Sequence, residues 1–219
     1  MGGQELFFRP EVFAHTLRAA KKHGFGVTYH VGEDFYDIVD GMRAVWEVIK
    51  FTESYPVDRL GHCMALGMQA KHYYSEKMFM QMPAQVMLDN IVWLCCFAKE
   101  KGIRIRKSLY DSLKVLAEDL YVKIGFDKEV ETLDMQDYYV SMFLRSDERC
   151  ADDGLDVWTQ TALLDTGQAD KARENKNAVP LNKAYMGNEN IIKDGDEMTQ
   201  AELFDSFPEY VRRIQTGQR

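Results

Sequence analysis

The stretch from Val27 to Glu33 reads VTYHVGE and decides how the rest of the chain is interpreted. It is a short apolar run that ends in a histidine, a glycine and a carboxylate. A second run, Val57 to His62 (VDRLGH), follows about one helix later. Both are typical of short strands bounded by turn residues. The two runs predict neighbouring strands that each place a histidine at the C-terminal end.

Helices are expected before each of these strands. Pro10 in a first turn and Gly24 after the last turn are start and stop signals for one helix. A strand over 25–30, a helix opened by Asp34 or a near neighbour, and a strand over 57–61 follow. The order helix–strand–helix–strand predicts parallel strands. Histidines at the C-terminal ends of parallel strands are the pattern expected at the mouth of a β/α barrel, where chemistry is housed.

The chain after these strands is predicted to be mostly helical. Apolar residues recur at helical spacing, with no strand-like alternation from 69 to 126, and helices are expected over 108–125 and 133–150. A short helix is expected over 155–164. The predicted fold class is therefore mostly α with a small parallel β element.

The last part of the chain is polar. Residues 166–199 are rich in Asn, Lys, Asp and Gly, which predicts a long loop or a disordered stretch. Thr199 to Glu202 resembles a cap before a short final helix that runs to Tyr210 or Ile214. The predicted organisation is a strand-bearing part over 1–68, a helical part over 69–165, and a polar loop with a short helix over 166–219.

Composition narrows the function classes. The 219 residues carry a net charge of −8 with a pI near 5.2, which argues against a dedicated nucleic-acid-binding surface. No signal peptide and no apolar run of membrane-spanning length is visible. Cys95 and Cys96 lie in an apolar run without C-x-x-C spacing, as buried free thiols do. A cytoplasmic protein with reduced thiols is expected.

The two strand ends carry residues that could do chemistry. His30 can ligate a metal, and Glu33 can exchange a proton with a substrate nitrogen if burial raises the pKa of its carboxyl. Gly32 lacks a Cβ and would let a substrate ring approach the backbone. Because adjacent parallel strands end side by side, His30, Glu33 and His62 are expected on a common side.

The motifs H-x-G-E at 30–33 and R-L-G-H at 59–62 resemble those of the adenosine deaminase and AMP deaminase superfamily, whose barrel carries H-A-G-E on the fifth strand and R-I-G-H-G on the sixth. Cys63 replaces the second glycine. The resemblance covers about residues 10–68. It implies that His30 is a zinc ligand, that Glu33 protonates N1 of a purine, that His62 orients and deprotonates the attacking water, and that Gly32 contacts the purine.

The same family takes its other zinc ligands from an H-x-H motif on the first strand and from an aspartate on the eighth. The chain has no H-x-H motif, and its single D-D pair, Asp152-Asp153, is interpreted as a solvated loop. The resemblance therefore implies a fragment of a (β/α)8 metal-dependent hydrolase barrel plus a helical insertion, inactive alone. Zinc and a purine nucleoside or nucleotide are expected in the full-length parent, with no stoichiometric zinc on this chain. The insertion resembles that of large bacterial anti-phage deaminases.

Two alternatives stay open. Residues 69–219 could be a helical assembly module of a larger complex. Its contacts would be the aromatic pair Tyr138-Tyr139 and a methionine-rich segment that contains Met64, Met68, Met78, Met80, Met82 and Met87. A homo-oligomer is one form of such an assembly, and exposed sheet edges favour it. The same three residues would also serve a related hydrolase that deaminates another heterocycle.

Overall fold

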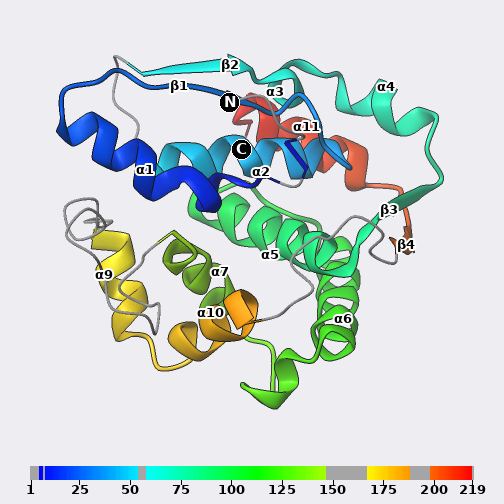
Figure 1. Ribbon diagram of the computed structural model, residues 1–219. Helices are drawn as coiled ribbons and strands as arrows, with labels where there is room; N and C mark the ends of the chain where they lie inside the picture. The colour runs from blue at the N-terminus through cyan, green and yellow to red at the C-terminus, as the bar shows by residue number, and fades with distance from the viewer. Residues whose placement is uncertain (1–4, 7, 54–57, 147–166, 188–197, 219) are drawn as a thin grey trace.

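The computed structural model describes residues 5–6, 8–53, 58–146, 167–187 and 198–218 (Figure 1). In chain order the elements are α1 (Pro10–Lys22), β1 (Thr28–Val31), α2 (Ile38–Phe51), β2 (Arg59–His62), α3 (Met64–Gly67), α4 (Ala70–Ser75), β3 (Phe79–Pro83), α5 (Ala84–Glu100), α6 (Lys107–Ile124), η1 (Phe126–Lys128), α7 (Met135–Ser141), η2 (Met142–Leu144), α9 (Gly167–Glu174), α10 (Ala178–Gly187), β4 (Met198–Glu202) and α11 (Phe207–Thr216).

β1 and β2 form a two-stranded parallel sheet in which His30 is paired with Gly61 and Val31 with His62. One face of this sheet packs on α2, where Val31 lies in a buried cluster with Val45 and Val48. The predicted fold class, mostly α with a small parallel β element, is confirmed. Its origin in a larger barrel stays a prediction.

Helix α2 begins where the chain can satisfy its first amide groups. The Asp37 side chain accepts a hydrogen bond from the Val39 N–H at 2.9 Å, and Tyr74 donates to the same carboxylate at 2.6 Å. The cap is therefore Asp37, three residues after Asp34, where the sequence predicted Asp34 or a near neighbour. Burial raises the pKa of Asp37, although these two hydrogen bonds oppose the increase.

A second sheet corrects the expectation that residues 69–126 contain helices and no strand. β3 pairs antiparallel with β4, so that Thr199 to Glu202 is strand and not a helix cap. Met80 and Met82 point inward in alternation with exposed neighbours. This period-2 pattern is short and its methionines carry little β propensity. The pairing strand also lies more than a hundred residues away, so local sequence does not reveal it.

The polar stretch that was expected to be a loop contains two helices, α9 and α10. Their packed faces use small side chains, including Ala169, Ala172 and Ala178, which are fully buried. Asn175, one of the asparagines that suggested a loop, is a capping group: its side chain accepts hydrogen bonds from Asn177 N–H and Ala178 N–H at 2.9 and 3.0 Å. The expected helix over 155–164, the end of the helix expected over 133–150, and Asp152-Asp153 lie outside the described residues.

One hydrophobic core joins the parts of the chain that the sequence separates. It includes Trp46 of α2, Trp93 of α5, Phe143 of η2 and Val211 of α11. The ring of Trp46 contacts those of Trp93 and Phe143, with centroids 6.3 and 5.2 Å apart. The helix beneath the parallel sheet is thus packed directly against the helical remainder. None of the described helices is long and apolar enough to cross a membrane.

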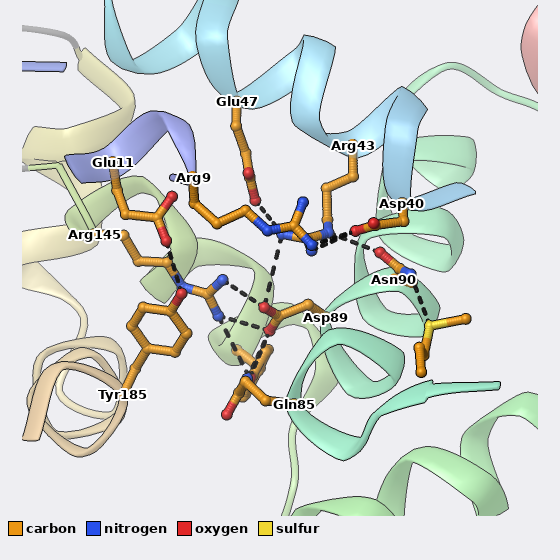
Figure 2. Close-up of polar contacts among 12 residues, drawn as sticks. Arg9, Glu11, Asp40, Arg43, Glu47, Gln85, Asp89, Asn90, Arg145 and Tyr185 are labelled. Atoms are coloured by element: carbon orange, nitrogen blue, oxygen red, sulfur yellow. Dashed lines mark hydrogen bonds and ion pairs between the residues drawn. The ribbon is translucent and has the colours of Figure 1, made fainter. Parts of the chain in front are cut away.

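A buried ion-pair network crosses the same junction (Figure 2). Arg9, just before α1, pairs with Asp40 of α2 at 2.6 Å, and Arg43 hydrogen-bonds Glu47 and Asn90. Arg145, after η2, binds both oxygens of Asp89 on α5 at 2.7 Å. Burial alone would raise the pKa of Asp89, but the Arg145 guanidinium holds it below the usual value.

Candidate functional site

Three sequence-predicted residues come together at the C-terminal ends of β1 and β2. The His62 Nε2 lies 3.2 Å from the Glu33 Oε2. The rings of His30 and His62 meet edge to face, with centroids 4.7 Å apart and planes at 76°. The parallel-strand argument therefore predicts their juxtaposition correctly. Their chemical roles are a separate matter and stay predictions.

Gly61 makes room for the imidazole of His30. A Cβ built on Gly61 would lie 2.2 Å from the His30 Cδ2, far inside any allowed contact. The ring of His30 consequently lies over the backbone of the neighbouring strand, at the position paired with it in register. Any side chain at 61 would push the imidazole away from His62.

The backbone at the end of β2 is unusual. His62 and Cys63 have φ values of +61° and +48°, in the left-handed region that favours glycine. The Cys63 N–H donates to the Val31 carbonyl at 2.9 Å, which ties this turn to β1. The extended conformation of β2 ends at this turn, with His62 as its last residue. Non-glycine residues keep a left-handed conformation only where surrounding contacts hold them. Such residues cluster at functional sites.

Gly32 has a structural reason to be glycine. Its φ is +74°, and a Cβ there would lie 3.2 Å from the Val45 Cγ2 and 3.4 Å from the Cys63 Cα. The side where a Cβ would stand therefore faces α2 and the β2 turn. The predicted contact of Gly32 with a substrate would have to use its backbone.

The group of three is open to solvent. The side chains of His62 and Glu33 are 38% and 49% exposed. An exposed imidazole beside a carboxylate can take up a proton from a bound molecule and pass it on. The sequence argument expected burial to tune Glu33, and the described residues leave that carboxylate half-exposed.

The described residues do not complete a zinc site. Zinc in proteins takes three or four nitrogen, sulfur or oxygen ligands. Among the residues that the structure describes, no group of three or more His, Cys, Asp or Glu side chains is arranged to hold a metal ion. His30 and His62 are neighbours, but the Nε2 of His62 already lies beside Glu33.

Glu5 is a residue of the site that the sequence argument missed. Its carboxylate accepts hydrogen bonds from three successive backbone N–H groups, those of Gly32, Glu33 and Asp34, the last two at 3.1 Å. Glu5 lies 28 residues before Glu33, and a lone glutamate ahead of a helix carries no local signal of such a contact. Only the folded chain reveals it.

The thiols are poor candidates for chemistry. Cys95 and Cys96 are buried at a groove between α5, α6 and the start of α7, together with Lys99 and Tyr110. Burial raises the pKa of the Cys96 thiol to about 12 and that of Cys95 further. Neither is a thiolate at neutral pH. As the sequence suggested, Cys95 and Cys96 are buried free thiols.

Several contact residues of the alternative assembly module lie inside the molecule. Tyr138 and Tyr139 belong to the core, as do Met80, Met82 and Met87. The aromatic pair therefore offers no exposed surface to a partner. Met64 and Met78 are exposed, at the start of α3 and just before β3.

Comparisons with known proteins leave the geometry of the site as the basis for a functional argument. No family model matches the chain, and no curated protein sequence matches it.

Proposed function

We propose that residues 10–68 carry part of the centre of an adenosine deaminase-like zinc hydrolase, which removes the amino group at C6 of a purine by hydrolysis. The observation that supports this most is the convergence of His30, Glu33 and His62 at the ends of two adjacent parallel strands. These are the residue types, in the chain order and on the elements, that the motif resemblance implies. The substrate class is a purine nucleoside or nucleotide.

In this proposal Glu33 and His62 divide the proton transfers. Hydrolytic deamination needs an acid that protonates the ring nitrogen and a base that takes a proton from the attacking water. Glu33 supplies the proton to the ring nitrogen, and His62 accepts one proton of the attacking water. The second proton of the water passes to the C6 amino group, which leaves as ammonia when the C6–O bond becomes a carbonyl. Their contact at 3.2 Å lets a proton pass between them after each turnover. His30 is the single metal ligand of this chain.

In this proposal the chain alone carries only part of the zinc site. The remaining zinc ligands would come from polypeptide outside these 219 residues, so the isolated chain should neither bind one equivalent of zinc nor turn over substrate. Metal analysis of the purified 219-residue chain tests this. Close to one zinc per chain, lost in His30→Ala, would contradict the incompleteness.

The functional test uses the longest polypeptide that contains this chain, supplied with zinc and with adenosine or its 5′-monophosphate. Ammonia release and loss of the aminopurine are measured. Glu33→Gln should lower turnover by about 10²–10⁴-fold, the usual contribution of a positioned proton donor, and leave the zinc content unchanged. The matched control is Glu131→Gln, on an exposed side chain between η1 and α7. Unchanged turnover in Glu33→Gln would remove Glu33 from the acid role, and no deamination by the wild type would end the proposal.

A further inference from the structure

The loop after β1 presents three consecutive N–H groups to one carboxylate. Gly32 N–H donates to the Oε1 of Glu5, and the N–H groups of Glu33 and Asp34 donate to its Oε2. Successive backbone N–H groups that converge in this way form a concavity that binds anions. Here the anion is a side chain from a segment 28 residues earlier. Hydrogen bonds to a charged acceptor are stronger than neutral ones, so this contact dominates the local conformation.

The same loop is tied to the end of β2. The Gly32 carbonyl accepts a hydrogen bond from the Ala65 N–H at 3.1 Å, two residues after the left-handed turn at His62 and Cys63. Gly32, whose N–H donates to Glu5, lies beside this turn, because a Cβ built on Gly32 would be 3.4 Å from the Cys63 Cα. Glu5 therefore lies next to both strand ends that carry the candidate site.

We propose that Glu5 is a positioning residue, whose carboxylate holds the Gly32–Asp34 loop so that the side chain of Glu33 faces His62. The inference rests on the proposed function for the meaning of that arrangement, but the arrangement itself is tested without turnover. Glu5 does not touch the reacting groups and acts through the backbone of the residue that does. The site therefore depends on a third segment, besides the two motif-bearing strands.

The role requires two acceptor oxygens. A glutamine at 5 keeps one acceptor oxygen and has an NH₂ group in place of the other. That NH₂ group cannot accept a hydrogen bond from a backbone N–H. An alanine at 5 removes the carboxylate, so that all three N–H groups can donate only to water. Glu5→Gln should therefore weaken the loop less than Glu5→Ala, and a small free carboxylate should replace the missing side chain in Glu5→Ala alone.

Amide hydrogen exchange of the 219-residue chain, followed by NMR, tests the positioning. In Glu5→Ala the amides of Gly32, Glu33 and Asp34 should exchange about tenfold faster or more, because each loses a charged acceptor. Amides in the middle of α5 should keep their wild-type rates. Added acetate should slow the three amides again in Glu5→Ala and leave the Glu131→Ala control unaffected.

Two results would overturn the inference. One is wild-type exchange of the three amides in Glu5→Ala. The other is an equal increase in α5, with no recovery in acetate, which would show a general loss of stability in place of local positioning. Glu5→Gln supplies the second variant if Glu5→Ala folds poorly, and its three amides should still exchange faster than in the wild type.

The deaminase assay separates this inference from the proposed function. In the longer polypeptide, Glu5→Ala should lower kcat because the side chain of Glu33 is no longer held facing His62, and acetate should restore part of kcat. If the exchange data hold but neither Glu5→Ala nor Glu33→Gln alters turnover, the positioning stands and the assigned acid is wrong. If Glu33→Gln abolishes turnover while Glu5→Ala has no effect on kcat, Glu5 has no positioning role in catalysis.

Discussion

At Cys63 a side chain occupies a backbone conformation that usually belongs to glycine. Its φ is +48°, and the related motif has glycine at this position. The left-handed conformation costs a non-glycine residue about 1–2 kcal/mol. The chain tolerates the cost because the Cys63 N–H is bonded to the Val31 carbonyl and the side chain packs beside Val31 and Val45.

Substitution at 63 should follow from this conformation. Cys63→Gly relieves the left-handed strain, offset in part by the greater freedom of glycine in the unfolded chain, and should leave stability within about 1 kcal/mol of wild type. Cys63→Val keeps the strain and adds a β-branch, so it should be less stable than Cys63→Gly by about 1–2 kcal/mol. Urea unfolding of both variants measures the difference. Equal stability of the glycine and valine variants would show that the turn is not strained.

At this scale the sequence was a good guide. His30, Glu33 and His62 come together because the order of elements makes the strands parallel, and parallel strands end side by side. The features that refine the site were not predictable. The left-handed backbone at His62 and the Glu5 contact depend on the turn and on a distant segment, and no local pattern encodes either.

At the scale of elements, α2 approaches α3 closely through Gly41. A Cβ at this position would lie 2.5 Å from the Ala65 Cβ and 2.8 Å from the Phe35 Cδ1. Glycine in a helix usually costs about 1 kcal/mol relative to alanine. Here the close approach of Ala65, which follows the His62 turn, makes the absence of a side chain necessary.

Gly41→Ala should therefore destabilise the protein in spite of its better helix propensity. Overpacking costs about 1–3 kcal/mol, and the α3 contact must move to relieve it. Gly187→Ala is the matched control, because nothing lies within 4 Å of its built Cβ and it belongs to a helix as well. Thermal or urea unfolding of both variants gives the comparison. A stabilised Gly41→Ala variant would show that α2 and α3 separate at little cost.

Element prediction succeeded where apolar spacing was long and regular. α6 has apolar residues at regular helical spacing and α1 has clear start and stop signals, and both were predicted. β3 and β4 were missed because each is five residues long and gains its stability from a partner far along the chain. α9 and α10 were missed because polar composition was read as disorder, whereas their few buried alanines suffice once packed.

At the scale of the whole molecule, buried charges link regions that the sequence assigned to different parts. Asp40 and Arg43 come from the predicted strand-bearing part, and Asp89 and Arg145 from the predicted helical part (Figure 2). Arg43 Nη1 lies 3.7 Å from Asp89 Oδ2. The partners are tens of residues apart, so no periodicity indicates them. Together with the shared hydrophobic core, this network connects α2, which packs against the sheet of the candidate site, to the helical part of the chain.

Glu47 gives this network a dependence on pH. Burial raises the pKa of Glu47 to about 7, although the Arg43 guanidinium opposes the increase. Its Oε2 is buried and has no hydrogen-bond partner among the described residues. Since the unfolded-state pKa is 4.5, the folded chain binds more protons between that pH and 7. The contribution of Glu47 to stability is thus fully present below pH 4.5 and is lost as pH rises through 7.

Glu47→Gln isolates that contribution from the other titrating groups. Glutamine keeps the shape and stays neutral, so the free energy of unfolding of the wild type should fall relative to Glu47→Gln by on the order of 1–3 kcal/mol between about pH 5 and about pH 8. Glu131→Gln, on an exposed side chain, should follow the wild type throughout. Urea unfolding across this range measures all three. A wild-type curve parallel to that of Glu47→Gln would mean that Arg43 keeps Glu47 ionised, and the network would then be a permanent set of ion pairs that does not respond to pH in this range.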